Sequence, residues 1–389
     1  MSDELVVLAV AFGVTFTLTP LMIRIANRVG AVVVPDVRHV HPVPTPLLGG
    51  AAMFGGFIAA FLVATQLDRY DAAFSASSEP WGILLGALAI YVVGLMDDLR
   101  PVSAPAKVAG QVMAGSVLYL LGVTMLFFRI PFADTVVLSP DFAPLLTVLW
   151  VVGMANAINL IDGLDGLAAG IVAIAAGAFF LYTERLTDAG VLGADSASGL
   201  IALITLGLCL GFLPHNFNPA RIFMGDAGSM LLGLLMASAT IMVGGRTDDP
   251  FSGQTFFFFA PLFIPFFILG VPIIDTAFAI VRRLIRHADV AAPDREHLHH
   301  RLVRLGHGHR RSVLILWAWT AILSGFVLYP TYTKTGDPIV PFGVAALGAA
   351  LYTFFHPGIR ARANRLEMDS EAERVAAGVD GDGSAVGPV

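Results

Sequence analysis

The sequence predicts an all-α membrane protein, a polytopic bundle of about eleven transmembrane helices with its N-terminus outside and its C-terminus inside. The first observation is compositional: 56% of the 389 residues are hydrophobic and only 13% are charged, against roughly 25% charged residues in soluble domains. The second is a series of apolar stretches, many of them near the about 20 residues that a helix needs to cross a bilayer. The third is an uneven distribution of lysine and arginine between alternate loops, which sets membrane orientation.

Eleven apolar stretches are the candidate transmembrane helices. The third is short, and the ninth is long and contains Pro261, Pro265 and Pro272. Proline removes a backbone donor and clashes with the preceding turn, so a kink or break is expected in the ninth helix. In chain order the candidates are 5–25, 48–66, 81–96, 107–128, 142–159, 166–183, 198–214, 227–244, 255–281, 312–330 and 338–355.

The basic residues give the orientation. If the N-terminus is outside, 18 of the 23 lysines and arginines fall in the inner loops and the C-terminal tail. The outer loops hold only Arg69, Arg129, Arg185, Arg246 and Lys334. Because positive charge accumulates on the cytoplasmic side of membrane proteins, this bias predicts an outer N-terminus and an inner C-terminus, and it supports the number of spans.

The chain is expected to form one transmembrane domain over 1–355, followed by a cytoplasmic tail over 356–389. From about residue 367 the tail is acidic, rich in glycine and nearly free of large apolar residues, which predicts disorder. The single cysteine, Cys209, excludes an intrachain disulfide. The predicted cytoplasmic loops lie near 30–47, 97–106, 160–166, 215–226 and 282–311.

Five polar stretches interrupt the apolar chain, and all of them fall on the predicted inner side. Taken singly, each has an ordinary structural explanation, since Asn and Asp near glycine form turns, arginine sets topology and phenylalanine is common at membrane interfaces. The stretches are Asp36 to Gly50, Asp97 to Arg100 followed by Lys107 and Gln111, Asn156 to Gly166, Asn218 to Ser229, and Asp294 to Arg301.

Taken together, these stretches gather acidic and amide side chains at the inner ends of apolar helices. Acids at membrane depth occur where they line a wet cavity or bind something, and paired carboxylates repel unless a cation or proton lies between them. Hard oxygen ligands without cysteine suit Mg²⁺ or Mn²⁺ and not zinc. Lys107, Arg301 and the histidines of the fifth stretch would then neutralise phosphate. The pattern therefore indicates an anionic, phosphorylated substrate.

With all five stretches in this order, the sequence resembles the polyprenyl-phosphate N-acetylhexosamine-1-phosphate transferases of glycosyltransferase family 4. The run Asn-x-x-Asn-x-x-Asp-Gly-x-Asp-Gly-Leu at 156–167 and Phe-Met-Gly-Asp at 223–226 are highly specific, whereas the Asp-Asp pair is specific only in their company. The match covers about 5–355. It implies a bundle of ten or eleven transmembrane helices with a catalytic site in a cleft on the cytoplasmic side of the cell membrane.

The resemblance also implies a role for each matched residue. Asp226 would be a direct ligand of Mg²⁺, for which Mn²⁺ can substitute, with Asn159 as a second ligand. Asp97 and Asp98 would face the lipid acceptor, one of them as a base, and the fifth-loop residues His297, His299 and His300 complete the expected catalytic set. Phe223 would lie beside uracil, Asp162 and Asp165 would shape the nucleotide pocket with Asn156 nearby, and Lys107 and Arg301 would hold the diphosphate.

Within the family, the fifth inner loop separates two branches. The motif here, His-Leu-His-His-Arg at 297–301, is closer to the branch that uses UDP-GlcNAc than to the three consecutive histidines of the UDP-MurNAc-pentapeptide branch. The Ala- and Val-rich spans, few lysines and acidic tail are similar to actinobacterial members, a resemblance compatible with a decaprenyl acceptor, and the choice between decaprenyl and undecaprenyl phosphate is left open.

The expected activity is transfer of GlcNAc-1-phosphate from UDP-GlcNAc to a polyprenyl phosphate, with release of UMP, as the first step of a lipid-linked cell-envelope glycan. The expected partners are UDP-N-acetylglucosamine, the polyprenyl phosphate and membrane lipids. No nucleic acid is expected, a homodimer is left open, and so is the choice between one step and a covalent two-step route.

Two alternatives differ from this interpretation. One is the same chemistry with UDP-MurNAc-pentapeptide, as in a phospho-MurNAc-pentapeptide transferase. The other is a multi-pass transporter, which predicts acids near mid-bilayer and weak internal repeats. The acids instead lie at the ends of apolar stretches and no repeat is present, so the transporter is the less favoured alternative.

Overall fold

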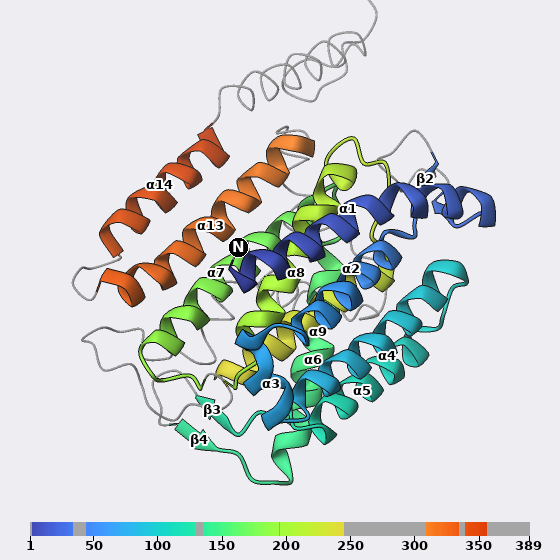
Figure 1. Ribbon diagram of the computed structural model, residues 1–389. Coiled ribbons are helices and arrows are strands. Elements are labelled where there is room, and N and C mark those ends of the chain that lie inside the picture. The colour runs from blue at the N-terminus through green and yellow to red at the C-terminus, as the bar shows by residue number, and fades with distance from the viewer. Residues whose placement is uncertain are drawn as a thin grey trace, which may run out of the picture.

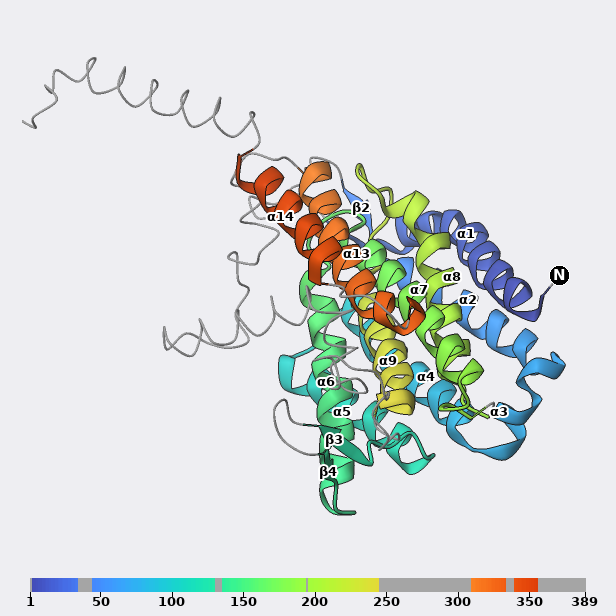
Figure 2. The same ribbon diagram turned by 90° about the vertical axis from the view of Figure 1, so that its left-hand side faces the viewer.

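The computed structural model describes residues 2–33, 44–129, 135–193, 195–244, 309–333 and 339–355. Within these ranges the chain is mostly helical, and its long helices form one bundle (Figures 1 and 2). Seven of the described helices are long and apolar enough to cross a membrane. The number rises to eight if Gly49–Ala64 and Asp68–Ala76, which meet at a bend of 90°, make one span. These helices support a polytopic membrane protein.

Helices lie at ten of the eleven predicted ranges. The eleventh, 255–281, with its predicted kink, lies outside the described residues, so the number of spans remains a prediction. The helices are α1 (Asp3–Val29), α2 (Gly49–Ala64), η1 (Asp68–Tyr70), α3 (Asp71–Ala76), α4 (Glu79–Leu99), α5 (Ala104–Leu120), α6 (Phe142–Ile161), α7 (Leu167–Asp188), α8 (Ser198–Asn216), α9 (Gly225–Gly244), α13 (His309–Thr333) and α14 (Ile339–Phe355).

Two details of the sequence prediction were wrong. The predicted helix 107–128 ends early, because α5 stops at Leu120 and Gly122 takes a left-handed conformation with φ of 100°, which glycine adopts at little cost. The chain is also not purely helical. Strands β3 (Phe127–Arg129) and β4 (Thr135–Val137) form an antiparallel hairpin, and β1 (Val32–Val33) pairs with β2 (Thr45–Pro46).

The helix α9 is the centre of the described bundle. It packs against α2, α4, α6 and α8, and nearly all of its side chains are buried inside the protein. Small residues permit the close approach: a Cβ placed on Gly94 of α4 would lie 2.5 Å from the Cα of Ala227 in α9. Helices in membranes associate through such close contacts between small residues. The start of α9 is therefore held firmly by its neighbours.

The two ends of the bundle differ in character. At one end, the guanidinium of Arg69 joins Glu4 at the start of α1, at 2.7 Å, to Glu184 near the end of α7, at 2.6 Å. The β3–β4 hairpin follows α5 and precedes α6 at this same end. The opposite end holds the last residues of α4, α6 and α8 and the first of α5, α7 and α9. All the predicted site residues that the structure describes lie at or near this second end.

The orientation of the bundle remains a prediction and can be tested with single cysteines. In intact cells, Asp188→Cys is expected to react with an impermeant thiol reagent, because Asp188 is exposed at the end of α7, on the predicted outer side. Glu296→Cys, in the predicted fifth inner loop, is expected to react only after permeabilisation. The native Cys209 is fully buried and serves as the unlabelled background. The reverse labelling pattern would invert the predicted orientation.

Candidate active site

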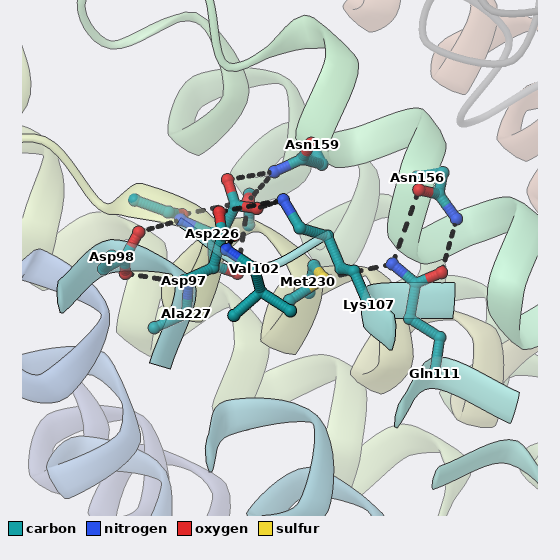
Figure 3. A network of polar contacts seen from close by, with 12 residues as sticks. Asp97, Asp98, Val102, Lys107, Gln111, Asn156, Asn159, Asp226, Ala227 and Met230 are labelled. Carbon is teal, nitrogen blue, oxygen red and sulfur yellow. Dashed lines mark hydrogen bonds and ion pairs between the residues drawn. The ribbon is translucent and has the colours of Figure 1, made fainter. Parts of the chain in front are cut away.

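Four helix ends meet at the second end of the bundle, and each contributes polar side chains predicted for the site (Figure 3). Asp97 and Asp98 lie in the last turn of α4, and Asn159 lies in the last turn of α6. Lys107 is in the first turn of α5, and Asp226 is the second residue of α9. These side chains are half-buried. The free-energy cost of polar groups is small at this position, because helix ends in membrane proteins reach water.

Lys107 is at the centre of this cluster. Its ammonium group donates to Oδ2 of Asp97 at 2.9 Å and forms a second, very short ion pair with Oδ2 of Asp226. The other oxygen of Asp97 accepts the backbone N–H of Val102 at 2.8 Å. One cation thus lies between two carboxylates from different helices, which removes the repulsion that they would otherwise exert on each other.

Asn159 holds Asp226 from the other side. Its Nδ2 donates to Oδ1 of Asp226 at 2.8 Å and to Oγ of Ser229 at 2.9 Å, so α6 is joined to the first turn of α9. The hydroxyl of Ser229 in turn donates to the carbonyl of Gly225 at 2.9 Å. Both oxygens of Asp226 are therefore oriented by neighbouring side chains.

Asp98 points away from Lys107. Its two oxygens accept the backbone N–H groups of Asp226 at 2.7 Å and Ala227 at 3.0 Å. Adjacent residues of a helix point about 100° apart, so the two acids of the pair serve different neighbours. Asp97 pairs with α5, whereas Asp98 pairs with the beginning of α9.

A second polar layer lies one turn deeper. Gln111 of α5 is fully buried, and its Oε1 accepts Nδ2 of Asn156 of α6 at 2.7 Å. Its Nε2 donates to the sulfur of Met230 of α9 at 3.1 Å. Gln111 follows Lys107 by four residues and Asn156 precedes Asn159 by three, so each stacks below its partner on the same helix face. Asn156, predicted to bind substrate, here bridges α5 and α6.

Asp162 follows the last residue of α6. Burial, together with repulsion from Asp226, Asp98 and Asp165, raises its pKa to about 8. The raised pKa favours the protonated carboxyl group, which can donate a hydrogen bond, as an ionised carboxylate cannot. A neutral carboxyl group at this position can face a carbonyl or another acceptor of a bound molecule.

Asp165 has a different environment, since it is only 3% exposed. Its Oδ2 accepts Nδ2 of Asn218 at 2.9 Å and the backbone N–H of Ala220 at 3.0 Å. Its own backbone N–H donates to Nε2 of His309 at 2.8 Å, at the start of α13. Asp165 thus connects the segment after α6 to the segment before α9 and to the start of α13. Its part in a nucleotide pocket stays a prediction.

Phe223 lies in the segment just before α9, and the first inner loop fixes its backbone. Its N–H donates to the carbonyl of Pro46 at 2.8 Å, and its own carbonyl accepts the N–H of Gly49 at 3.0 Å. The carbonyl of Met224 accepts the N–H of Gly50 at 2.9 Å. The ring is half-buried, beside the turn that leads to Asp226.

The structure thus brings together Asp97, Lys107, Asn159 and Asp226, with Asp98 on the far side of Asp226. His297, His299, His300 and Arg301 lie outside the described residues. The sequence prediction gave no role to Gln111, Asn218, Ser229 and His309, which contact Asn156, Asp165, Asn159 and the backbone of Asp165 respectively. The only signal for them was position, because Gln111, Asn218 and Ser229 occur within or beside the quoted polar stretches.

The donor set of the cluster fits a hard divalent cation. Among the described residues, no three acidic, histidine or cysteine side chains converge on one point. The carboxylate of Asp226 lies next to Asn159, whose Oδ1 accepts no hydrogen bond from the described part of the chain. Mg²⁺ is usually held by one or two protein oxygens and completes its shell with water and phosphates. The Asp226 carboxylate and the Oδ1 of Asn159, once that amide turns its oxygen toward Asp226 in place of its nitrogen, would suit a magnesium ion that arrives with a phosphorylated ligand.

Comparison with known proteins adds a family and named relatives. Residues 80–244, which include the whole cluster, match the family model described as glycosyl transferase family 4. A relative from Mycobacterium leprae, a decaprenyl-phosphate N-acetylglucosaminephosphotransferase, is 39% identical over 88% of this chain and 82% of its own length. The protein of the same name from Mycolicibacterium smegmatis is 38% identical over 87% of this chain and 85% of its own length.

A relative from the second branch is more distant. The phospho-N-acetylmuramoyl-pentapeptide-transferase of Desulforudis audaxviator is 33% identical over 83% of this chain and 97% of its own length. Both kinds of relative extend over most of the chain, so the similarity is not limited to the polar motifs.

Proposed function

The chain belongs to glycosyl transferase family 4, and on that premise we propose that it transfers N-acetylglucosamine-1-phosphate from UDP-N-acetylglucosamine to a polyprenyl phosphate. The observation that carries this proposal is the ammonium of Lys107 held between Asp97 and Asp226 at the end of the bundle. One cation and two carboxylates at a membrane surface suit a reaction between two phosphates, one soluble and one carried by a lipid. The names of the mycobacterial relatives support decaprenyl phosphate as the acceptor.

The proposed location follows from the substrates. The described helices make the chain a multi-pass membrane protein. The proposed site opens to the cytoplasm, where nucleotide sugars are made, and the acceptor reaches it from the lipid with its phosphate at the interface. The basic residues of the predicted inner loops support this side. UDP-N-acetylglucosamine, the lipid acceptor and the surrounding membrane are the proposed partners.

The proposed reaction is a phosphoryl transfer. A nonbridging oxygen of the polyprenyl phosphate attacks the β-phosphorus of the donor, and the bond from that phosphorus to the bridging oxygen of UMP breaks. The products are UMP and a lipid-linked pyrophosphoryl sugar. A phosphate monoester has a second pKa near 6, so the acceptor is largely ionised at pH 7 without a base. Stabilising negative charge on the leaving phosphate is therefore the main task of the protein.

Lys107 is proposed to carry much of that task. In the structure its ammonium is shared by Asp97 and Asp226, which fix its position and keep it protonated. A bound diphosphate can replace part of this pairing and receive the positive charge at its bridging oxygen. Asp97 then orients Lys107 and contributes by positioning more than by accepting a proton.

Mg²⁺ is proposed as the cofactor, held by Asp226 and Asn159. When bound, it would neutralise phosphate charge, which is its usual contribution to phosphoryl transfer. Asp162 is proposed to shape the nucleotide pocket, where its raised pKa would favour a carboxyl group that donates a hydrogen bond. The fifth-loop residues lie outside the described residues, where His297, His299 and His300 remain predicted catalytic residues and Arg301 a predicted contact of the diphosphate.

The choice of donor can be tested on the purified full-length protein in detergent. With decaprenyl phosphate and Mg²⁺, UDP-N-acetylglucosamine is expected to release UMP at least about a hundredfold faster than UDP-MurNAc-pentapeptide, because a donor lacking its specific contacts loses several kcal/mol. The measurement is UMP release, and a reaction from which decaprenyl phosphate is omitted gives the background. Preference for the pentapeptide donor would instead place the chain in the branch represented by the Desulforudis relative.

A further inference from the structure

Asp98 lies on α4, but both of its hydrogen-bonded partners belong to α9. The carboxylate accepts the N–H groups of Asp226 and Ala227, which are in the first turn of that helix. The first N–H groups of a helix have no partner within it, and an anion at this end also interacts favourably with the helix dipole. Asp98 therefore acts as a helix cap supplied by a neighbouring helix.

The backbone around this contact is built for a close approach. Gly225 has a left-handed conformation, with φ of 67°. A Cβ on it would lie 2.5 Å from both carboxylate oxygens of Asp98, so a larger residue there would displace the carboxylate. Gly94, one helical turn before Asp98, packs against the backbone of Ala227. Two glycines thus allow α4 to bring one carboxylate to the start of α9.

The neighbouring acid lacks this arrangement. Asp97 is joined to the Lys107 ammonium and to the N–H of Val102, both outside α9. Asp98 has no ion pair with a side chain of the described residues, and its two oxygens are each occupied by a backbone N–H. Its effect on the site therefore passes through the position of Asp226, which it holds at a fixed distance from Lys107 and Asn159.

We infer that Asp98 is a positioning residue that sets the place of Asp226 by capping α9, and that it does not touch the lipid acceptor. The inference rests on the proposed function for its effect on turnover, but the contact itself is a property of the fold. It separates the two adjacent acids, which have the same chemistry but different tasks. Asp97 orients the lysine, and Asp98 orients the helix that carries Asp226.

Replacement of the carboxylate distinguishes a cap from a base. Asp98→Asn keeps an oxygen that can accept an N–H group, so kcat is expected to fall by only about threefold to tenfold. Asp98→Ala keeps no acceptor, and the resulting displacement of Asp226 is expected to lower kcat by about a hundredfold. The pH dependence of kcat/KM and the KM for decaprenyl phosphate should be unchanged in Asp98→Asn. Equal inactivation of both variants, or loss of one limb of the pH profile, would overturn the inference, because that is the behaviour of a base.

A second experiment needs no substrate. Thermal unfolding of the full-length protein in detergent is compared for Asp98→Ala, Gly225→Ala and the double variant. Each single change is expected to lower Tm by several degrees. The double variant should lose clearly less than the sum of the two single losses, because both changes break the same contact. Additive losses in Tm would mean that the two residues act independently and would overturn the inference. A parental protein that releases no UMP would refute the proposed function alone, since the unfolding cycle still decides the contact.

Discussion

Replacing Asp226 by asparagine is expected to lower kcat by about a hundredfold to a thousandfold. The carboxylate is the common partner of Lys107 and Asn159, so its charge both fixes the lysine and supplies the proposed metal ligand. The amide has nearly the same shape but no charge, and it is a weaker ligand for Mg²⁺. The measurement is UMP release from UDP-N-acetylglucosamine over a range of Mg²⁺ concentrations.

The matched control for this change lies on the same helix. Ser238→Ala removes a buried hydroxyl that donates to the carbonyl of Leu234 at 2.8 Å, three turns away from Asp226. This control variant is expected to stay within about twofold of the parental rate, since a local hydrogen bond within a helix is worth about 1 kcal/mol of stability at most. An Asp226→Asn protein with turnover within tenfold of the parent would contradict the assignment. Parental activity that survives chelation of divalent ions would contradict the metal.

Replacing Lys107 by methionine is expected to lower kcat to a similar extent and also to destabilise the protein. Methionine preserves the length and apolar stem of the side chain but leaves the half-buried carboxylates of Asp97 and Asp226 without the cation that joins them. Two carboxylates that share a site repel each other unless one takes up a proton. We therefore expect kcat to fall by about a thousandfold and Tm to fall at pH 8, because the two carboxylates have lost the cation that they share.

Two further variants separate charge from position. Arg100→Met removes a positive charge from the exposed residue that follows α4, and it should change kcat by less than about twofold because exposed charges contribute little. The double variant Lys107→Met with Asp97→Asn should recover stability at pH 8 but not turnover. Recovery of turnover in the double variant would mean that Lys107 serves only to neutralise Asp97 and has no part in the reaction.

The sequence predicted the clustering of Asp97, Lys107, Asn159 and Asp226 for a topological reason. Each lies at the end of an apolar stretch, and alternate ends of antiparallel helices share one side of a membrane. The clustering of these four residues could therefore be predicted without any knowledge of side-chain geometry. The hairpin β3–β4 was missed because an apolar run of β-branched and aromatic residues is read equally well as a helix end.

The division of labour between Asp97 and Asp98 could not be predicted in this way. It depends on which of two adjacent side chains faces α5 and which faces α9, a matter of helix rotation and not of pattern. The partners of Asp165 could not be predicted from the sequence for a different reason. Asn218 is 53 residues away and His309 is 144 residues away, and no local signal in the sequence links residues at such separations. Helix ends are thus predictable, and their contacts are not.

The central place of α9 has a consequence for biosynthesis. The helices that pack most closely around it among the described residues, α2, α4, α6 and α8, all precede it in the chain. A ribosome therefore releases Asp97, Lys107 and Asn159 into the membrane before Asp226 exists. On the nascent chain the polar cluster lacks one member until α9 is inserted, and Asp226 at the start of α9 then joins Lys107 to Asn159. Among the described residues, the packing of α9 between α2, α4, α6 and α8 and the completion of this polar cluster are one event in the life of each new molecule.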